Sequence, residues 1–147
     1  MATPIKFDLT LEPHGYGDVW PEYYIRIDGQ LQDQGTLKQT MTWHFDTDLE
    51  DGSHILSVGL SNKQDIDTVV KDGKIVADKA IYIHPIEIEG YKLDDFMHRA
   101  VYYPLGRDSL KSNYLGWNGE WQLDFATPIY TWIHETQHLG WIYGKKL

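Results

Sequence analysis

Apolar and polar residues alternate with a period of two along most of the chain. The first clear case is Ile5, Phe7, Leu9 and Leu11, which are separated by single polar residues. The same alternation recurs in four later stretches, residues 23–27, 41–45, 81–88 and 119–125. Side chains of a strand point alternately to its two faces, so this period predicts strands that bury one face.

Two-residue turn signals separate the alternating stretches. Asp-Gly pairs stand at residues 28–29, 51–52 and 72–73, and an Asn-Gly pair stands at 118–119. Such dipeptides favour tight turns between antiparallel strands, and we expect the Asn-Gly pair to close a hairpin within residues 114–125. Short strands joined by such turns predict an all-β fold, an antiparallel β-sandwich or jelly roll. No repeat, linker or low-complexity segment interrupts it, so we expect a single domain over residues 1–147.

The last part of the chain carries a different period. Thr127-Pro128 is a typical helix start, with Thr as the N-cap and Pro at the first helical position. Ile129, Trp132 and Ile133 then follow helical spacing, and Gly140 is a natural end. We therefore expect a short C-terminal helix of about three turns that packs Trp132 and Ile133 onto the sandwich.

Composition and charge exclude several classes of function. The formal net charge is −9, which disfavours a nucleic-acid partner and an anionic membrane surface. The chain has no cysteine, so a disulfide, a thiolate nucleophile and a cysteine-based metal site are excluded. No stretch resembles a signal peptide or reaches the roughly 18 apolar residues of a membrane span. We expect a soluble protein that is made in a cytoplasm.

One short motif suggests zinc chemistry. His134, Glu135 and His138 form the His-Glu-x-x-His pattern, which on a helix gives two zinc ligands and a general base. A catalytic zinc needs a third protein ligand, and the residues after His138 contain no His, Asp or Glu. That ligand would have to come from upstream, from a carboxylate or from one of His14, His44, His54, His84 and His98. We therefore expect no zinc and keep a zinc metallohydrolase as the second alternative.

A group of oxygen-bearing side chains suggests a different cation. Asn62, Asp65, Asp67 and Asp78 stand around predicted strand ends, and Ca²⁺ takes six to eight oxygen ligands. The spacing is not that of an EF-hand loop, because the required Gly and closing Glu are missing. The same residues are also typical of ordinary polar turns, so a calcium site and a plain loop both remain open.

A family resemblance spans roughly residues 5–90, and two of its motifs lie at 56–62 and 78–90. The run DKAIYIHPIEIEG at 78–90 resembles the terminal strands of small calcium-dependent xylan-binding β-sandwich modules, and Leu56 to Asn62 resembles the strand before their Asn-Asp pair. The resemblance implies the fold, sugar binding and a calcium ion held in part by Asn62 and Asp78. It departs from the pattern at Lys63 and His84, which stand where those modules have carboxylates, so the full ligand set does not carry over.

The same layout, with an aromatic tail, also resembles domains in structural proteins of tailed bacteriophages, especially marine myoviruses. This resemblance implies a non-enzymatic structural or accessory protein of a virion, such as a decoration, neck or fibre component. It would be located in the virion and would contact other virion proteins, including further copies of itself. A sandwich has strand edges that such contacts cover.

Six tryptophans provide candidate ligand contacts. Trp43 and Trp121 have apolar neighbours two positions away, which predicts the core, whereas Trp20 and Trp117 stand in predicted loops. Tyr102 and Tyr103, which precede a proline, are expected to pack under a loop. The first alternative function is therefore a carbohydrate-binding module whose glycan stacks on Trp20 or Trp117, with a calcium ion near Asn62, Asp65, Asp67 and Asp78.

Overall fold

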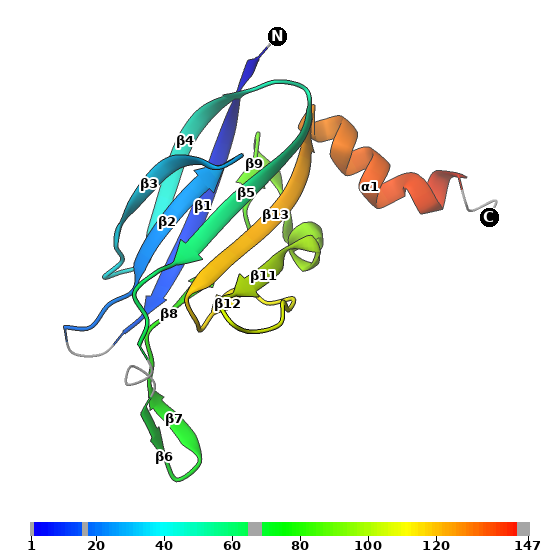
Figure 1. Cartoon of the computed structure of the whole chain (residues 1–147). Coiled ribbons are helices and arrows are strands. Elements are labelled where there is room, and N and C mark those ends of the chain that lie inside the picture. The colour runs from blue at the N-terminus through cyan, green and yellow to red at the C-terminus, as the bar shows by residue number, and fades with distance from the viewer. Residues whose placement is uncertain (1, 16–17, 65–68, 144–147) are drawn as a thin grey trace.

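The computed structural model describes residues 2–15, 18–64 and 69–143, and the side chains of 69, 75–77, 95 and 137–143 lie outside that description. Two antiparallel β-sheets face each other, and one helix follows the last strand (Figure 1). The predicted all-β sandwich with a short C-terminal helix is therefore confirmed. Within the described chain, no helix is long and apolar enough to cross a membrane.

The first sheet is organised around its longest strand, β1 (Thr3–His14). On one side β1 pairs with β4 (Met41–Leu49), and on the other it pairs first with β9 (Glu87–Ile88) and then with β8 (Ala80–Ile83). The outer positions belong to β10 (Tyr91–Lys92), beside β9, and β12 (Tyr114–Leu115), beside β8.

The second sheet has five strands. Their order is β11 (Val101–Pro104), β13 (Gly119–Thr127), β5 (Gly52–Leu60), β2 (Glu22–Ile27) and β3 (Gln30–Thr36). A separate hairpin of β6 (Val69–Lys71) and β7 (Lys74–Ala77) extends away from the sandwich (Figure 1). A 3₁₀ helix, η2 (Asp94–Arg99), precedes β11.

The core is built from the alternating apolar residues. Ile5, Phe7, Leu9 and Leu11 of β1 are all buried, as the period-two pattern predicted. Phe7 joins the two sheets, because its ring stacks on Phe45 of β4 at 5.2 Å and meets Phe125 of β13 edge-on at 5.8 Å. Both predicted core tryptophans also face inward: Trp121 is fully buried and Trp43 packs against the core.

Not every predicted turn closes a hairpin. At Asp28-Gly29 both residues have positive φ, 50° and 81°, as expected for a tight hairpin turn, and Asp72-Gly73 behaves in the same way with 54° and 78°. The expected hairpin at Asn118-Gly119 is wrong. Residues 114–115 form β12 and pair with β8, whereas β13 pairs with β11 and β5, so the chain crosses from one sheet to the other there.

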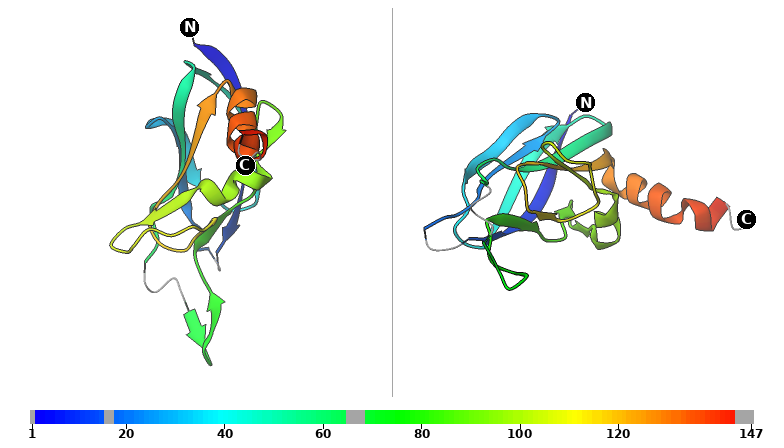
Figure 2. Two further views of the ribbon diagram at one scale, coloured as in Figure 1. Left: turned by 90° about the vertical axis from the view of Figure 1, so that its right-hand side faces the viewer. Right: turned by 60° about the horizontal axis from the view of Figure 1, so that its bottom comes forward.

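The C-terminal helix α1 (Ile129–Tyr143) lies where the sequence predicts a helix, but it begins one residue later than expected and continues through Gly140. The predicted N-cap is wrong, because Thr127 is the last residue of β13 and the carbonyl of Pro128 accepts the first helical bond, from the Trp132 N–H. The Thr127 hydroxyl donates to the carbonyl of Glu50 (2.9 Å) and so ties the start of the helix to the β4–β5 turn. Ile129 is buried, and the ring of Trp132 lies 5.0 Å from that of Phe96. Beyond this first part, the helix projects away from the sandwich (Figure 2).

Replacing Trp121 tests the core. Trp121 is fully buried between the sheets, so Trp121→Ala should lower the free energy of unfolding by about 3–5 kcal/mol through lost burial and a residual cavity. Tyr130→Ala is the control, because 61% of Tyr130 is exposed and such surface changes stay within about 0.5 kcal/mol. Urea denaturation measures both, and equal losses in the two variants would contradict the assigned core.

Candidate functional site

A row of side chains crosses the outer face of the second sheet. Strand pairing places Tyr103 of β11 opposite Glu120 of β13, which is opposite Gly59 of β5, which is opposite Tyr24 of β2. The preceding or following residue of each strand is buried in the core, so these four point outward. We call Tyr103, Glu120, Gly59 and Tyr24 the outer row.

Gly59 makes room for an aromatic ring in this row. A Cβ added at Gly59 would lie 2.0 Å from ring atoms of Tyr24, so the Tyr24 ring lies directly over the glycine. From there the Tyr24 hydroxyl donates a hydrogen bond of 2.8 Å to Oε1 of Glu120. The missing side chain therefore lets Tyr24 reach across β5 to β13.

Glu120 is the centre of the polar contacts. Its Oε1 also lies 3.7 Å from Nη1 of Arg26, whose guanidinium stands 4.3 Å from the centroid of the Tyr24 ring. Its Oε2 accepts a hydrogen bond of 2.6 Å from Gln122. Burial, and then the hydrogen bond and charge of Glu120, raise the pKa of Tyr24 to about 12.

Beside this network lies a hollow of about 480 Å³, the strand hollow. Its lining combines two tyrosines and aliphatic groups with amide and carboxylate groups: Tyr24, Leu60, Ser61, Tyr103, Leu105, Asn118, Gly119, Glu120 and Gln122. Tyr103 is 46% exposed, which corrects the expectation that it packs under a loop with Tyr102. Mostly apolar walls with a few fixed polar groups are typical of small-ligand sites.

Trp117, one of the two predicted ligand contacts, stands in the loop next to this hollow. It is 40% exposed, and the guanidinium of Arg107 lies 4.4 Å from the centroid of its ring. The buried Tyr102 holds the loop, because its hydroxyl accepts a bond of 2.9 Å from the Trp117 backbone N–H and donates to the Trp117 carbonyl. Trp20, the other predicted contact, is half-buried. A ligand role for either tryptophan stays a prediction.

Of the four predicted calcium residues, Asn62 and Asp78 lie in the described part of the chain, and both have other partners. Asp65 and Asp67 lie outside the described residues. The Asn62 side chain accepts from the Glu22 backbone N–H (2.8 Å) and donates to the Trp20 carbonyl (3.0 Å).

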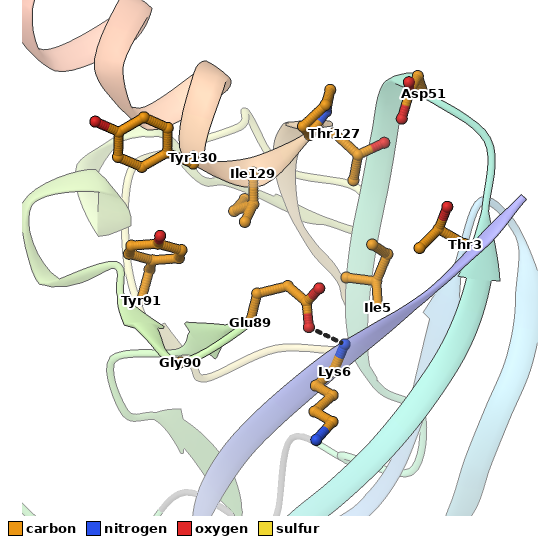
Figure 3. A pocket seen from close by; sticks show the side chains of 11 residues that line it. Thr3, Ile5, Lys6, Asp51, Glu89, Gly90, Tyr91, Thr127, Ile129 and Tyr130 are labelled. Carbon is orange, nitrogen blue, oxygen red and sulfur yellow. Dashed lines mark hydrogen bonds between the residues drawn. The ribbon is translucent and has the colours of Figure 1, made fainter.

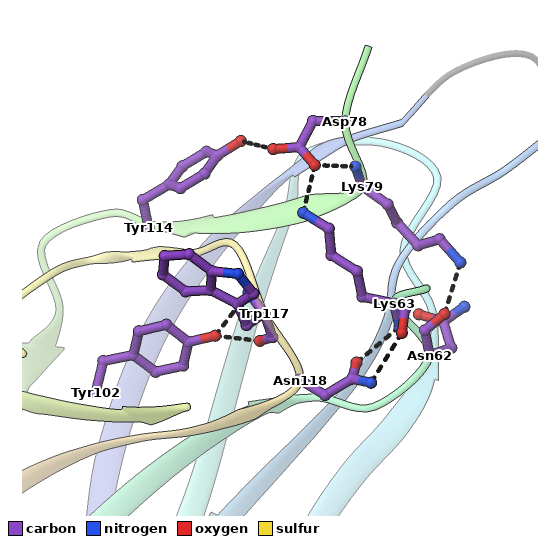
Figure 4. Close-up of polar contacts among 8 residues, drawn as sticks. All are labelled: Asn62, Lys63, Asp78, Lys79, Tyr102, Tyr114, Trp117 and Asn118. Carbon is purple, nitrogen blue, oxygen red and sulfur yellow. Dashed lines mark hydrogen bonds and ion pairs between the residues drawn. The ribbon is translucent and has the colours of Figure 1, made fainter. Parts of the chain in front are cut away.

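Both oxygens of Asp78 accept hydrogen bonds (Figure 4). Oδ1 accepts from the ammonium of Lys63 and the backbone N–H of Lys79, and Oδ2 accepts from the hydroxyl of Tyr114. Burial and the negative Asp78 raise the pKa of Tyr114 above its usual range. Asn62 and Asp78 in this arrangement do not fit a calcium ion.

The zinc motif lies on α1. His134 and Glu135 are exposed, and the His134 ring stacks on that of Tyr130 with 6.2 Å between centroids. The side chain of His138 lies outside the described residues. Among the side chains that are described, no group of three or more His, Asp or Glu could hold a metal ion. The zinc metallohydrolase therefore stays an untested hypothesis.

A larger hollow of about 720 Å³, the helix hollow, lies where β1, the β9–β10 turn and the start of α1 meet (Figure 3). Tyr91 and Tyr130 stand on one side of it, with ring centroids 6.1 Å apart. Two carboxylates, Asp51 and Glu89, line it, and Glu89 accepts a hydrogen bond of 3.1 Å from the Lys6 backbone N–H. The strand hollow is the better candidate despite its smaller volume, because four adjacent strands, β11, β13, β5 and β2, hold its polar groups and aromatic rings in a fixed register.

Comparison with known proteins identifies similar folds rather than relatives. No family model matches the sequence, and no curated protein matches it. A selenomethionine form of vCBM60, described as part of a link by circular permutation between two families of calcium-dependent carbohydrate-binding modules, is 13% identical. It has a TM-score of 0.52, and the match covers 81% of this chain and 89% of that one. vCBM60 in complex with galactobiose is also 13% identical, with a TM-score of 0.49 and coverage of 82% and 97%.

The expected likeness to a calcium-dependent carbohydrate-binding β-sandwich is thereby confirmed for the fold. The similar structures lend no support to a place in a phage particle, so the virion role, its protein partners and its location remain sequence-based predictions.

Sequence reasoning missed the outer row. Tyr24, Gly59 and Glu120 belong to three different strands, and only the register of the sheet brings them together. The available signal was that each stands in a predicted strand, next to an apolar residue that is expected to face the core. That signal assigns a residue to the outer face of a strand but does not identify its neighbours.

Gly59→Ala tests the outer row. The new methyl group must displace the Tyr24 ring and break its bond to Glu120, so the free energy of unfolding should fall by about 1–3 kcal/mol. Gly35→Ala on β3, the outermost strand of the same sheet, is the matched control, because an added Cβ there meets its nearest atom, in Tyr23, at 3.5 Å. Thermal unfolding compares the two. A Gly59→Ala variant as stable as Gly35→Ala would contradict the position of Tyr24.

Alkaline pH should weaken the fold. Burial and acceptor carboxylates raise the pKa of both Tyr23 and Tyr24 from 10.0 to about 12. The unfolded chain then loses phenol protons before the folded chain does, so this stability is present below pH 10 and is lost as pH rises toward about 12. Urea denaturation across that range should show a shallower decline for Tyr24→Phe, and an identical decline would contradict the raised pKa.

Proposed function

We propose that this chain binds carbohydrate without transforming it, and that the sugar lies in the strand hollow. The observation that carries the proposal is the outer row, where the exposed Tyr103 ring stands beside the hydrogen-bonded pair of Tyr24 and Glu120. The fold similarity to a carbohydrate-binding module supports the proposal at the level of the scaffold.

The chemistry of the hollow suits a sugar ring. One face of a pyranose carries mainly C–H groups, which pack against an aromatic ring such as Tyr103, while its hydroxyls need fixed donors and acceptors. Asn118, Glu120 and Gln122 line the same hollow and supply amide and carboxylate groups. Strand β13 holds Glu120 and Gln122, and two bonds to the Lys63 main chain hold Asn118, so the sugar meets a preformed site.

Charge favours a neutral glycan. The chain carries a formal net charge of −9, and the carboxylate of Glu120 lies at the wall of the hollow. A polyanionic sugar would meet like charge, whereas the hydroxyls of a neutral sugar can donate to that carboxylate. We therefore propose a neutral oligosaccharide as the ligand class.

Two exposed tyrosines provide a matched test. Tyr103, 46% exposed, lines the strand hollow, and Tyr91, 41% exposed, lines the helix hollow. In affinity electrophoresis through gels that contain xylan, galactan or β-glucan, one polysaccharide should retard the native chain. Tyr103→Ala should weaken that binding about tenfold, which corresponds to roughly 1.4 kcal/mol, and Tyr91→Ala should leave it unchanged.

The alternatives give different results. Loss of retardation in Tyr91→Ala alone would move the sugar to the helix hollow and contradict the proposed site. Loss in Trp117→Ala with Tyr103→Ala unaffected would return the site to the tryptophan predicted from sequence. No retardation of the native chain by any neutral polysaccharide would contradict the proposed function itself.

A further inference from the structure

A compact cluster of charges joins separate segments of the chain at one end of the sandwich (Figure 4). Asn62 and Lys63 follow β5, Asp78 and Lys79 precede β8, and Tyr114 belongs to β12. We call these five residues the Asp78 cluster. The strands they follow or precede belong to both sheets, so the cluster ties the sheets together at this end.

The charges of the cluster are held away from solvent. The side chains of Lys63 and Asp78 are only 9% and 12% exposed, and Lys79 is 6% exposed. Taking such groups out of water is costly unless opposite charges and hydrogen bonds compensate for the lost hydration. A buried lysine at a strand end therefore needs a structural reason.

The two ammonium groups link the same two segments, one from each side. Lys63, from the β5 side, reaches Oδ1 of Asp78, while Lys79, from the β8 side, donates a bond of 2.7 Å to the main-chain carbonyl of Asn62. Asn118 adds a third connection, because its side chain accepts from the Lys63 backbone N–H (2.7 Å) and donates to the Lys63 carbonyl (2.9 Å). Cations thus draw together carboxylate and carbonyl oxygens from separate segments.

Drawing together carboxylate and carbonyl oxygens is also what a calcium ion does in proteins. A calcium ion at this cluster would need the oxygens that the ammonium groups of Lys63 and Lys79 already engage, and it would be repelled by both positive charges. We propose that Lys63 and Lys79 take the structural place of a bound divalent cation, so that this end of the sandwich is held without calcium. This inference concerns the scaffold and holds whether or not the chain binds sugar.

Covalent attachment distinguishes a lysine from an exchangeable ion. The lysine charge cannot be removed by a chelator, whereas a bound ion stabilises a protein only in proportion to its concentration and affinity. The native chain should therefore have the same thermal midpoint in excess EDTA and in millimolar calcium. Native mass spectrometry should show the mass of the chain alone after it is mixed with calcium.

Removing one ammonium group tests whether the stability of the fold depends on the Asp78 cluster. Lys63→Met keeps most of the side-chain length but leaves the Asp78 carboxylate without this partner, so the thermal midpoint should fall by about 10 °C. Lys38→Met is the matched control, because Lys38 is exposed, and its midpoint should stay within about 1 °C of the native value. A double variant, Lys63→Met with Asp78→Asn, should lose less than the sum of the two single losses, since the second change removes the carboxylate charge that the Lys63 ammonium balances.

Two results would overturn the inference. A rise of several degrees in the native midpoint on adding calcium, reversed by EDTA, would show that the ion still binds and stabilises the fold. A Lys63→Met variant with the native midpoint would show that the ammonium does not hold the cluster. Should Lys63→Met fail to fold, the calcium and EDTA comparison on the native chain still decides the question.

Discussion

The burial of Trp121 between the two sheets constrains the rest of the second sheet. Once this side chain of β13 points inward, Glu120 and Gln122 on either side of it must point outward, because successive residues of a strand alternate between faces. The register with β11 and β5 then brings Tyr103 and Gly59 beside Glu120. The hydrophobic core on the inner face of the sheet therefore positions the polar and aromatic side chains of its outer face.

Asn118 couples that surface to the charged cluster at the end of the sandwich. It lines the strand hollow, and its side chain bonds both the N–H and the carbonyl of Lys63. Tyr102 supports the same loop through the backbone of Trp117. The rim of the proposed sugar site is thus joined to the main chain of Lys63, whose ammonium pairs with Asp78, although neither of these two residues lines the hollow.

Local patterns predicted the strands well and their partners poorly. The alternation of Ile5 to Leu11 is a property of neighbouring residues, so the sequence alone identified β1 and its buried face. Asn118-Gly119 also has the local signature of a hairpin, yet Tyr114 and Leu115 pair with β8 in the other sheet. Lys63 was recognised as a charge out of place in a calcium site. Its contact with Asp78, fifteen residues later, depends on tertiary structure.

The family resemblance implies one calcium ion for two roles, holding the end of the sandwich and binding sugar. The Asp78 cluster indicates that these two roles lie at different places in this chain. A calcium ion can hold a sandwich end in shape and can also coordinate sugar hydroxyls, because it has vacant coordination positions. An ammonium that is already bonded to Asp78 or to the Asn62 carbonyl, and that is shielded from solvent, can perform the first task but not the second. A sugar-binding chain built in this way needs its ligand contacts elsewhere. The outer row, on the open face of the second sheet, offers the aromatic ring and the fixed polar groups that this requires.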